Sequence, residues 1–249
     1  MPEHDRIRLA NLTGDELGAA LREGRWLLLP FGVVEQHGPH LPLGTDLIQA
    51  EYICAAVAER VNGLAAPALP YGVCRTMRNL PGTVSLTPAT FEAVVREVVA
   101  EYARHGGRRF ALISGHAEPA QLEAMREAVL PVVNADTSLT VLVIGPYDLL
   151  DPIRREAGLE GTDGHAGSIE TSAMLAVAEM TVRTDRIPKV TRPRLSRFHV
   201  MSNPEAEFPT GVRGDTSKVS RELGERALRH IVTEIAHLLE RTERGGREW

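Results

Sequence analysis

The sequence predicts an α/β fold built around a mostly parallel sheet. Short apolar runs alternate with amphipathic segments along the 249 residues, and neither an internal repeat nor a linker interrupts this alternation. Strands that alternate with helices usually pair in parallel, because the chain must cross back over the sheet before the next strand. The chain is 43% hydrophobic, which is enough for residues 1–249 to share one large core as a single domain.

Four apolar runs predict the strands of this sheet. The run at 26–34 (WLLLPFGVV) is uninterrupted, as is typical of a buried strand. A second strand is expected at 109–114 (RFALIS) and a third at 139–144, whereas the run at 64–69 is a weaker candidate.

Helices are predicted between these runs. In the clearest one, Thr87 and Pro88 form a cap and first turn, apolar residues then recur every three or four positions, and Gly106 and Gly107 end the pattern. The other helices are expected at residues 46–61, 120–133, 169–179 and 218–241. The proline-rich segment 187–214 predicts a long loop, which in a compact domain is often functional.

Charge and cysteine content limit the kind of protein. The chain has 28 Lys and Arg against 33 Asp and Glu, a net charge of -5, which argues against a nucleic-acid binder that needs a basic face. Cys54 and Cys74 lack the spacing of metal-binding cysteines, so we expect free thiols, buried or half-buried, in a reducing cytoplasm. No run is apolar enough for a signal peptide or membrane span, which predicts a cytoplasmic protein without a membrane partner.

Three polar clusters follow predicted strands, where ligands bind in open parallel sheets. They span residues 35–46 (EQHGPHLPLGTD), 114–118 (SGHAE) and 161–172 (GTDGHAGSIETS). Carboxylate and imidazole groups are the usual ligands of Zn, Mn and Fe in hydrolases, and the His-x-Glu of the second cluster repeats the Glu-x-His of the first in reverse order. Together the clusters predict a metal centre.

Each cluster also has a simpler interpretation. The first could be a surface loop with incidental histidines, and Glu118 could cap a helix. His165 stands among small residues and could move protons beside a metal, or could only hydrogen-bond its own loop. Glu170 could support a metal ligand from behind, or could be a favourable acid in the first turn of a helix.

Taken together, these motifs resemble those of the creatininase family. The segment 35–46 is similar to the family signature, and further matches occur at PGTVSL (81–86), at 110–116, at DGHAG-x-x-ETS (163–172) and at GVRGD (211–215). The resemblance runs almost from end to end. It implies a three-layer α/β/α sandwich with a mostly parallel central sheet, a homo-oligomer, and hydrolysis of a non-peptide C–N bond in a small amide.

The resemblance also implies two divalent metal ions per subunit, which can be Zn, Mn or Fe. Positions that match Glu35, Asp46 and His116 hold one ion in the family. Positions that match His37, Asp46 and Glu118 hold the other, so that Asp46 bridges the pair and Glu118 also handles a proton of the activated water. The position that matches the histidine of DGHAG protonates the leaving nitrogen.

Departures from the family pattern bear on the substrate. Gly164 replaces the glutamate that precedes this histidine, His165, in enzymes that act on creatinine, and the tryptophans that close over creatinine are not matched. The segments around Arg75 and Arg78 are more similar to the formamide hydrolases of the family. That similarity implies that the two arginines bind a phosphate or carboxylate group; the alternative is a pair of solvated surface arginines.

Two other functions fit the same residues. One is a metallopeptidase that trims a short modified peptide in cofactor maturation, for which an open groove is expected in place of a closed pocket. The other is a non-catalytic metal-binding protein on the same fold. The sequence leaves the metal and the substrate open.

Overall fold

The computed structural model of the protein describes residues 7–190 and 203–245. Within these ranges the chain forms a four-stranded sheet in the order β2-β1-β3-β4. The strands are β1 (Leu27–Phe31), β2 (Leu64–Ala65), β3 (Arg109–Ser114) and β4 (Thr140–Ile144). All neighbouring strands are parallel, so their carboxyl ends meet at one edge of the sheet.

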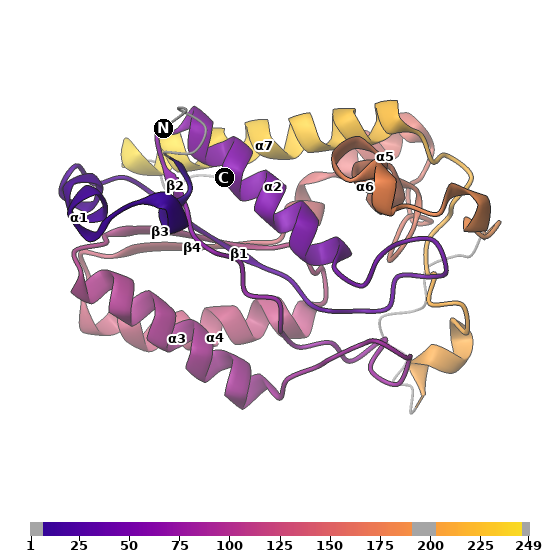
Figure 1. Ribbon diagram of the computed structural model, residues 1–249, viewed down its shortest axis with the longest axis horizontal. Helices are drawn as coiled ribbons and strands as arrows, with labels where there is room; N and C mark the ends of the chain where they lie inside the picture. Colours follow the sequence, from indigo (N-terminus) through magenta and orange to yellow (C-terminus); the bar gives the residue numbers. More distant parts are fainter. Residues whose placement is uncertain (1–6, 191–202, 246–249) are drawn as a thin grey trace.

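Helices cover both faces of this sheet (Figure 1), which confirms the predicted α/β/α sandwich. On one face lie α2 (Thr45–Arg60) and α7 (Arg221–Glu243), with α5 (Asp151–Ala157) and α6 (Ser168–Val177) packed beside them. On the other face lie α3 (Pro88–Arg104) and α4 (Pro119–Ala135), together with α1 (Gly14–Arg22). Short 3-10 turns occur at Leu9–Asn11, Pro146–Leu149, Glu179–Thr181, Thr184–Arg186 and Pro204–Glu207.

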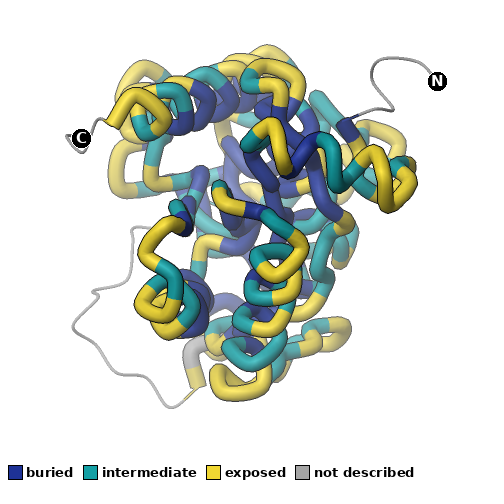
Figure 2. The backbone as a smooth tube through the Cα atoms, turned by 90° about the vertical axis from the view of Figure 1, so that its left-hand side faces the viewer, coloured by how far each residue is buried: buried dark blue, intermediate teal, exposed yellow. Residues whose placement is uncertain are grey.

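Alternate strand residues supply two separate cores. Leu28 and Ala111 pack toward α2 and α7, whereas Leu29 and Phe110 pack toward α3 and α4. Figure 2 shows buried backbone in the interior and exposed positions on the outer turns of the helices. Burial on both faces explains the uninterrupted apolar runs that predicted these strands.

The predicted elements are present, and their ends differ by a few residues. The last helix begins at Arg221, because Ser220 caps it by accepting a hydrogen bond from the N–H of Leu223. The weak strand predicted at 64–69 keeps only two residues in the sheet, and Leu69 forms an isolated bridge with Phe31. Helices α1 and α5 were not predicted; α5 has only seven residues, too few to show a helical period.

Part of the predicted loop 187–214 lies outside the described residues, namely 191–202. The remainder is irregular apart from the turn at Pro204–Glu207. Within the described ranges, no helix combines the length and the apolar character that crossing a membrane requires.

Candidate metal centre and active site

Four predicted metal ligands meet at the carboxyl edge of the sheet. Glu35 and His37 come from the loop after β1, Asp46 from the first turn of α2, and His116 from the turn after β3. Their exposed fractions are 1%, 0%, 1% and 5%, respectively. Charged side chains this deeply buried require a compensating partner.

Two glycines allow the strand ends to approach α2 this closely. A Cβ atom at Gly115 would lie 2.0 Å from the backbone oxygen of Asp46, and one at Gly32 would lie 2.7 Å from the backbone nitrogen of Leu47. Both separations are too short for a real contact, so any side chain there would displace the start of α2. The glycine before His116 therefore helps to place Asp46.

Asp46 connects two groups of donor atoms. Its Oδ1 lies 3.1 Å from His37 Nε2, and its Oδ2 lies 3.1 Å from His116 Nδ1. Glu35 Oε2 belongs to the His116 group, at 2.9 Å from Nδ1. Glu170 Oε2 belongs to the His37 group, at 3.7 Å from Nε2. A carboxylate with one oxygen in each group has the arrangement of a ligand that bridges two metal ions.

The protein alone does not satisfy the first group. Glu35 Oε2 and Asp46 Oδ2 have no hydrogen-bond partner among the described residues, although His116 Nδ1 lies within 3.1 Å of both. An unsatisfied buried polar atom costs about 1–3 kcal/mol of stability. Two carboxylate oxygens that converge on one imidazole nitrogen fit a site for a cation that displaces the imidazole proton, and the donor types suit a divalent metal.

Hydrogen bonding also prepares His37 for a metal. Its Nδ1 lies 3.0 Å from the carbonyl oxygen of Glu35, which can only accept, so Nδ1 carries the proton. Nε2 then faces Asp46 and Glu170, and it offers its lone pair to a metal once its own proton is displaced. Histidine ligands are commonly fixed by a hydrogen bond from the other ring nitrogen in this way.

The charges of the cluster shift its pKa values. Burial lowers the pKa of His37 and His116, but the carboxylates around each ring together outweigh it and hold both pKa values well above the ordinary range. Asp46 and Glu170 act on His37, and Glu35 and Asp46 act on His116. Burial raises the pKa of Glu170, but His37, His165 and the N–H of Ala166 together outweigh it and bring this pKa to about 2. The imidazoles of the metal-free cluster therefore hold protons, which metal binding has to displace.

Glu118 lies on the other side of the His116 ring. Its Oε2 accepts hydrogen bonds from the backbone N–H groups of Arg75 and Thr76, at 2.7 and 3.2 Å, and lies 3.7 Å from His116 Nε2. Glu118 is thus beside the ring, next to the nitrogen that does not face the other donors. Arg75 and Arg78 are exposed, and neither belongs to the lining of the pocket over the donor groups.

His165 lies against the His37 group. The two rings are 4.2 Å apart, and His165 Nε2 lies 2.8 Å from the carbonyl oxygen of Gln36. Since a carbonyl only accepts, Nε2 carries a proton. His40 faces elsewhere: its Nε2 contacts Thr171 Oγ1 at 2.9 Å, and burial lowers its pKa to about 4.

A pocket of about 580 Å³ covers the donor groups. Its volume lies in the range of sites that bind small molecules. The pocket wall includes His165 and Glu118. Other polar residues of the wall are Tyr147, Asp148, Arg154, Asp163 and Arg213. Burial raises the pKa of the Asp163 carboxyl to about 6, even though Arg154 lies 3.5 Å away.

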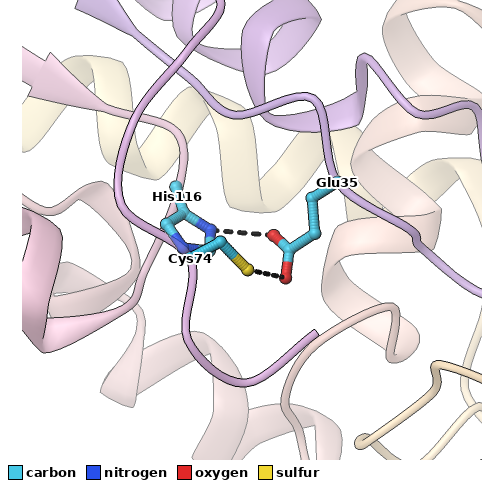
Figure 3. Close-up of side chains that lie close together, drawn as sticks. All are labelled: Glu35, Cys74 and His116. Carbon is cyan, nitrogen blue, oxygen red and sulfur yellow. Dashed lines mark hydrogen bonds and ion pairs between the residues drawn. The ribbon is translucent and has the colours of Figure 1, made fainter. Parts of the chain in front are cut away.

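One side chain of this cluster, the thiol of Cys74, is absent from the ligands predicted from the sequence. Cys54 and Cys74 are both buried free thiols, as predicted. Cys74 Sγ also donates to Glu35 Oε1 at 3.2 Å, which Figure 3 shows together with the contact between Glu35 and His116. Spacing between cysteines could not reveal this contact, because the partner of Cys74 is a glutamate 39 residues away.

Comparison with known proteins identifies the family of the chain. Residues 10–239 match the family model described as creatininase, creatinine amidohydrolase. A creatinine amidohydrolase of Pseudomonas putida is 33% identical, with 92% of this chain and 95% of that protein aligned. A mycofactocin precursor peptide peptidase of Mycobacterium ulcerans is 30% identical, over 96% and 94% of the two chains.

The fold comparison gives the same result. A solved structure of creatininase with manganese superposes with a TM-score of 0.87 and 30% identity, covering 95% of this chain and 98% of the other. The match of the family model covers most of the chain, and the structural match extends over the same fold. The chain therefore belongs to the creatininase family, and it is a metal-dependent amidohydrolase.

Proposed function

We propose that this chain hydrolyses a non-peptide C–N bond in a small amide, either a cyclic amide or a formamide, with two divalent ions bound per subunit. The observation that carries the proposal is Asp46, whose two carboxylate oxygens belong to different donor groups. Ions held there would lower the pKa of a water molecule and polarise the substrate carbonyl. Carboxylate and imidazole donors suit Zn, Mn and Fe alike.

The donor distances support one change to the predicted ligands. The first ion keeps its predicted set of Glu35, Asp46 and His116. For the second ion, Glu170 fits better than Glu118, because Glu170 Oε2 lies 3.7 Å from the metal-facing nitrogen of His37. Both carboxylates also accept backbone N–H groups, Glu118 from Arg75 and Thr76 and Glu170 from Ala166. The two differ in the nitrogen that they face, because Glu118 lies beside Nε2 of His116, on the far side of that ring from Asp46.

We assign the proton transfers to the pocket wall. Glu118 would orient His116 and accept a proton from the attacking water. His165 would protonate the departing nitrogen, since its ring lines the pocket and the carbonyl of Gln36 holds it in place. An amide nitrogen departs poorly without a proton, and a positioned acid contributes about 10²–10⁴-fold to the rate.

Peptide trimming is the second candidate, and the resemblance to the mycofactocin precursor peptide peptidase supports it. A pocket of about 580 Å³ suits a small substrate better than an extended peptide. A purely metal-binding role has less support, because His165 and Glu118 line the same pocket as the donor groups. The homo-oligomer that the resemblance implies stays a prediction, which light scattering can test.

A substrate panel tests the proposed function. The metal-reconstituted protein would be offered cyclic amides including creatinine, neutral and phosphorylated formamides, and short peptides, with release of amine or formate as the measurement. We expect turnover of at least one non-peptide amide, and none by Asp46→Asn. Turnover of peptides alone would establish the second candidate instead.

A further inference from the structure

A buried thiol extends the first donor group of the metal centre. Cys74 Sγ lies 3.2 Å from Glu35 Oε1, and Glu35 Oε2 lies 2.9 Å from His116 Nδ1. Figure 3 shows the sulfur and the imidazole ring on the same side of the Glu35 carboxylate, each facing a different oxygen. Ligand atoms of the three residues all lie within 4.8 Å of one another. Sulfur, oxygen and nitrogen donors thus surround one point.

These separations are close to those around a metal. Tetrahedral zinc with bonds of about 2.0–2.3 Å keeps its ligand atoms roughly 3.3–3.8 Å apart. The 2.9 and 3.2 Å separations fall slightly short of this range and end at different oxygens of Glu35, so the ion would have to spread the three side chains apart. Glu35 is only 1% exposed, and its Oε2 has no hydrogen-bond partner within the described ranges. This buried acceptor indicates a cation independently of the thiol.

The backbone holds Cys74 in position. Its own N–H and those of its neighbours in the segment 73–76 all donate to side chains, and the acceptors are Gln121, Ser85 and Glu118. A ligand fixed in advance binds its metal at a lower entropic cost. Cys54 differs, because it lies within α2 in an apolar core and belongs to none of the possible metal-binding groups in the described chain.

We propose that Cys74 is a ligand of the ion held by Glu35, Asp46 and His116. This inference rests on the proposed two-metal centre. A sulfur donor is softer than oxygen or nitrogen, so the site favours zinc or cobalt over manganese or magnesium. Four protein donors close this site, whereas the second donor group, with three, keeps a position open for water.

Cobalt spectroscopy tests the assignment without measuring activity. The metal-free full-length protein is loaded with Co²⁺ under reducing, anaerobic conditions, and the ultraviolet thiolate-to-cobalt charge-transfer band is recorded. The variants are Cys74→Ser and its matched control Cys54→Ser, which removes the other buried thiol. We expect the band in the wild type and in Cys54→Ser, and its loss in Cys74→Ser.

Zinc and manganese affinities provide a second readout. Loss of a residue that only supports a metal ligand costs about 10–100-fold in affinity, so loss of the ligand itself is expected to weaken zinc at least 10-fold. Manganese binding should change less, and Cys54→Ser should match the wild type.

The outcomes separate the two proposals. If no form of the protein binds cobalt, the metal centre itself is wrong. If Cys54→Ser binds cobalt without the charge-transfer band, the centre stands and the role of Cys74 is wrong; this result decides the matter even if Cys74→Ser fails to fold. A band that persists in folded Cys74→Ser also refutes the assignment.

Discussion

Replacement of Asp46 with asparagine affects both donor groups at once. The wild-type carboxylate places one oxygen 3.1 Å from His37 Nε2 and the other 3.1 Å from His116 Nδ1. An asparagine keeps one oxygen, so an amide group must face one of the two sites. Since the amide NH2 has no lone pair to donate, that site loses a ligand, and the other keeps only a neutral one.

The expected magnitude follows from this geometry. Loss of a supporting residue behind a metal ligand costs about 10–100-fold in affinity. Loss of a direct ligand that two ions share should lower the affinity for each ion by at least as much. The combined affinity for both ions is therefore expected to fall by about 10²–10⁴-fold or more. Turnover should fall to background, because Asp46→Asn cannot hold both ions.

Metal titration against a chelator of known affinity measures this change, and His40→Ala is the matched control. His40 belongs to the same loop and is equally buried, but its Nε2 contacts Thr171. We expect His40→Ala to lose about 1–3 kcal/mol of stability, as when a buried partner is left unsatisfied, and to keep both ions per folded molecule. Unchanged affinity in Asp46→Asn, or equal metal loss in both variants, would refute the bridging role.

Three further predictions concern the other members of the site. His165→Ala should keep both ions but lose about 10²–10⁴-fold in turnover, measured with metal content on one preparation; normal turnover would exclude the proton-transfer role. Glu170→Gln should lose the second ion, whereas Glu118→Gln should keep both and turn over slowly; the reverse pattern in metal analysis would restore Glu118 as the ligand. In the metal-free protein, the raised pKa values predict that His37 and His116 contribute their full stabilisation below about pH 6.5. This contribution is lost as the pH rises through the pKa values of the two histidines in the folded protein. Melting temperatures across this range test it, and a metal-free form that is no less stable at high pH would contradict it.

The layers of the fold could be predicted because burial leaves a local pattern. Strands covered on both faces are uninterrupted apolar runs, and α3 carries its own cap and apolar stripe. The short strand β2 and the helix α5 could not be predicted with the same accuracy. Pro67 has no N–H and interrupts the ladder after Ala65, although Ala66 and Leu69 still donate to β1. The seven residues of α5 do not establish a helical period.

The residues of the metal centre could likewise be predicted only in part. Glu35, His37, Asp46 and His116 could be predicted as a group, because each follows or begins an element that ends at one sheet edge, and the structure brings all four together. The difference between Glu118 and Glu170 depends on side-chain direction, which spacing does not encode. Only the fold shows that the carboxylate of Glu170 faces His37.

The pocket also bears on the choice between substrates. A phosphorylated formamide needs an unengaged cation beside the metal centre, and the sequence suggested Arg75 and Arg78 for this role. Both are exposed and outside the pocket lining, which instead contains Arg213, stacked on Phe208, and Arg154. Arg154 pairs with Asp151 at 2.9 Å and approaches Asp163 at 3.5 Å. An anionic group would have to displace these carboxylates, at a cost in ion pairing that a neutral amide avoids. At Arg154 the arrangement therefore favours neutral cyclic amides and formamides over phosphorylated ones, and Arg213 is the pocket cation that a phosphorylated substrate would have to engage.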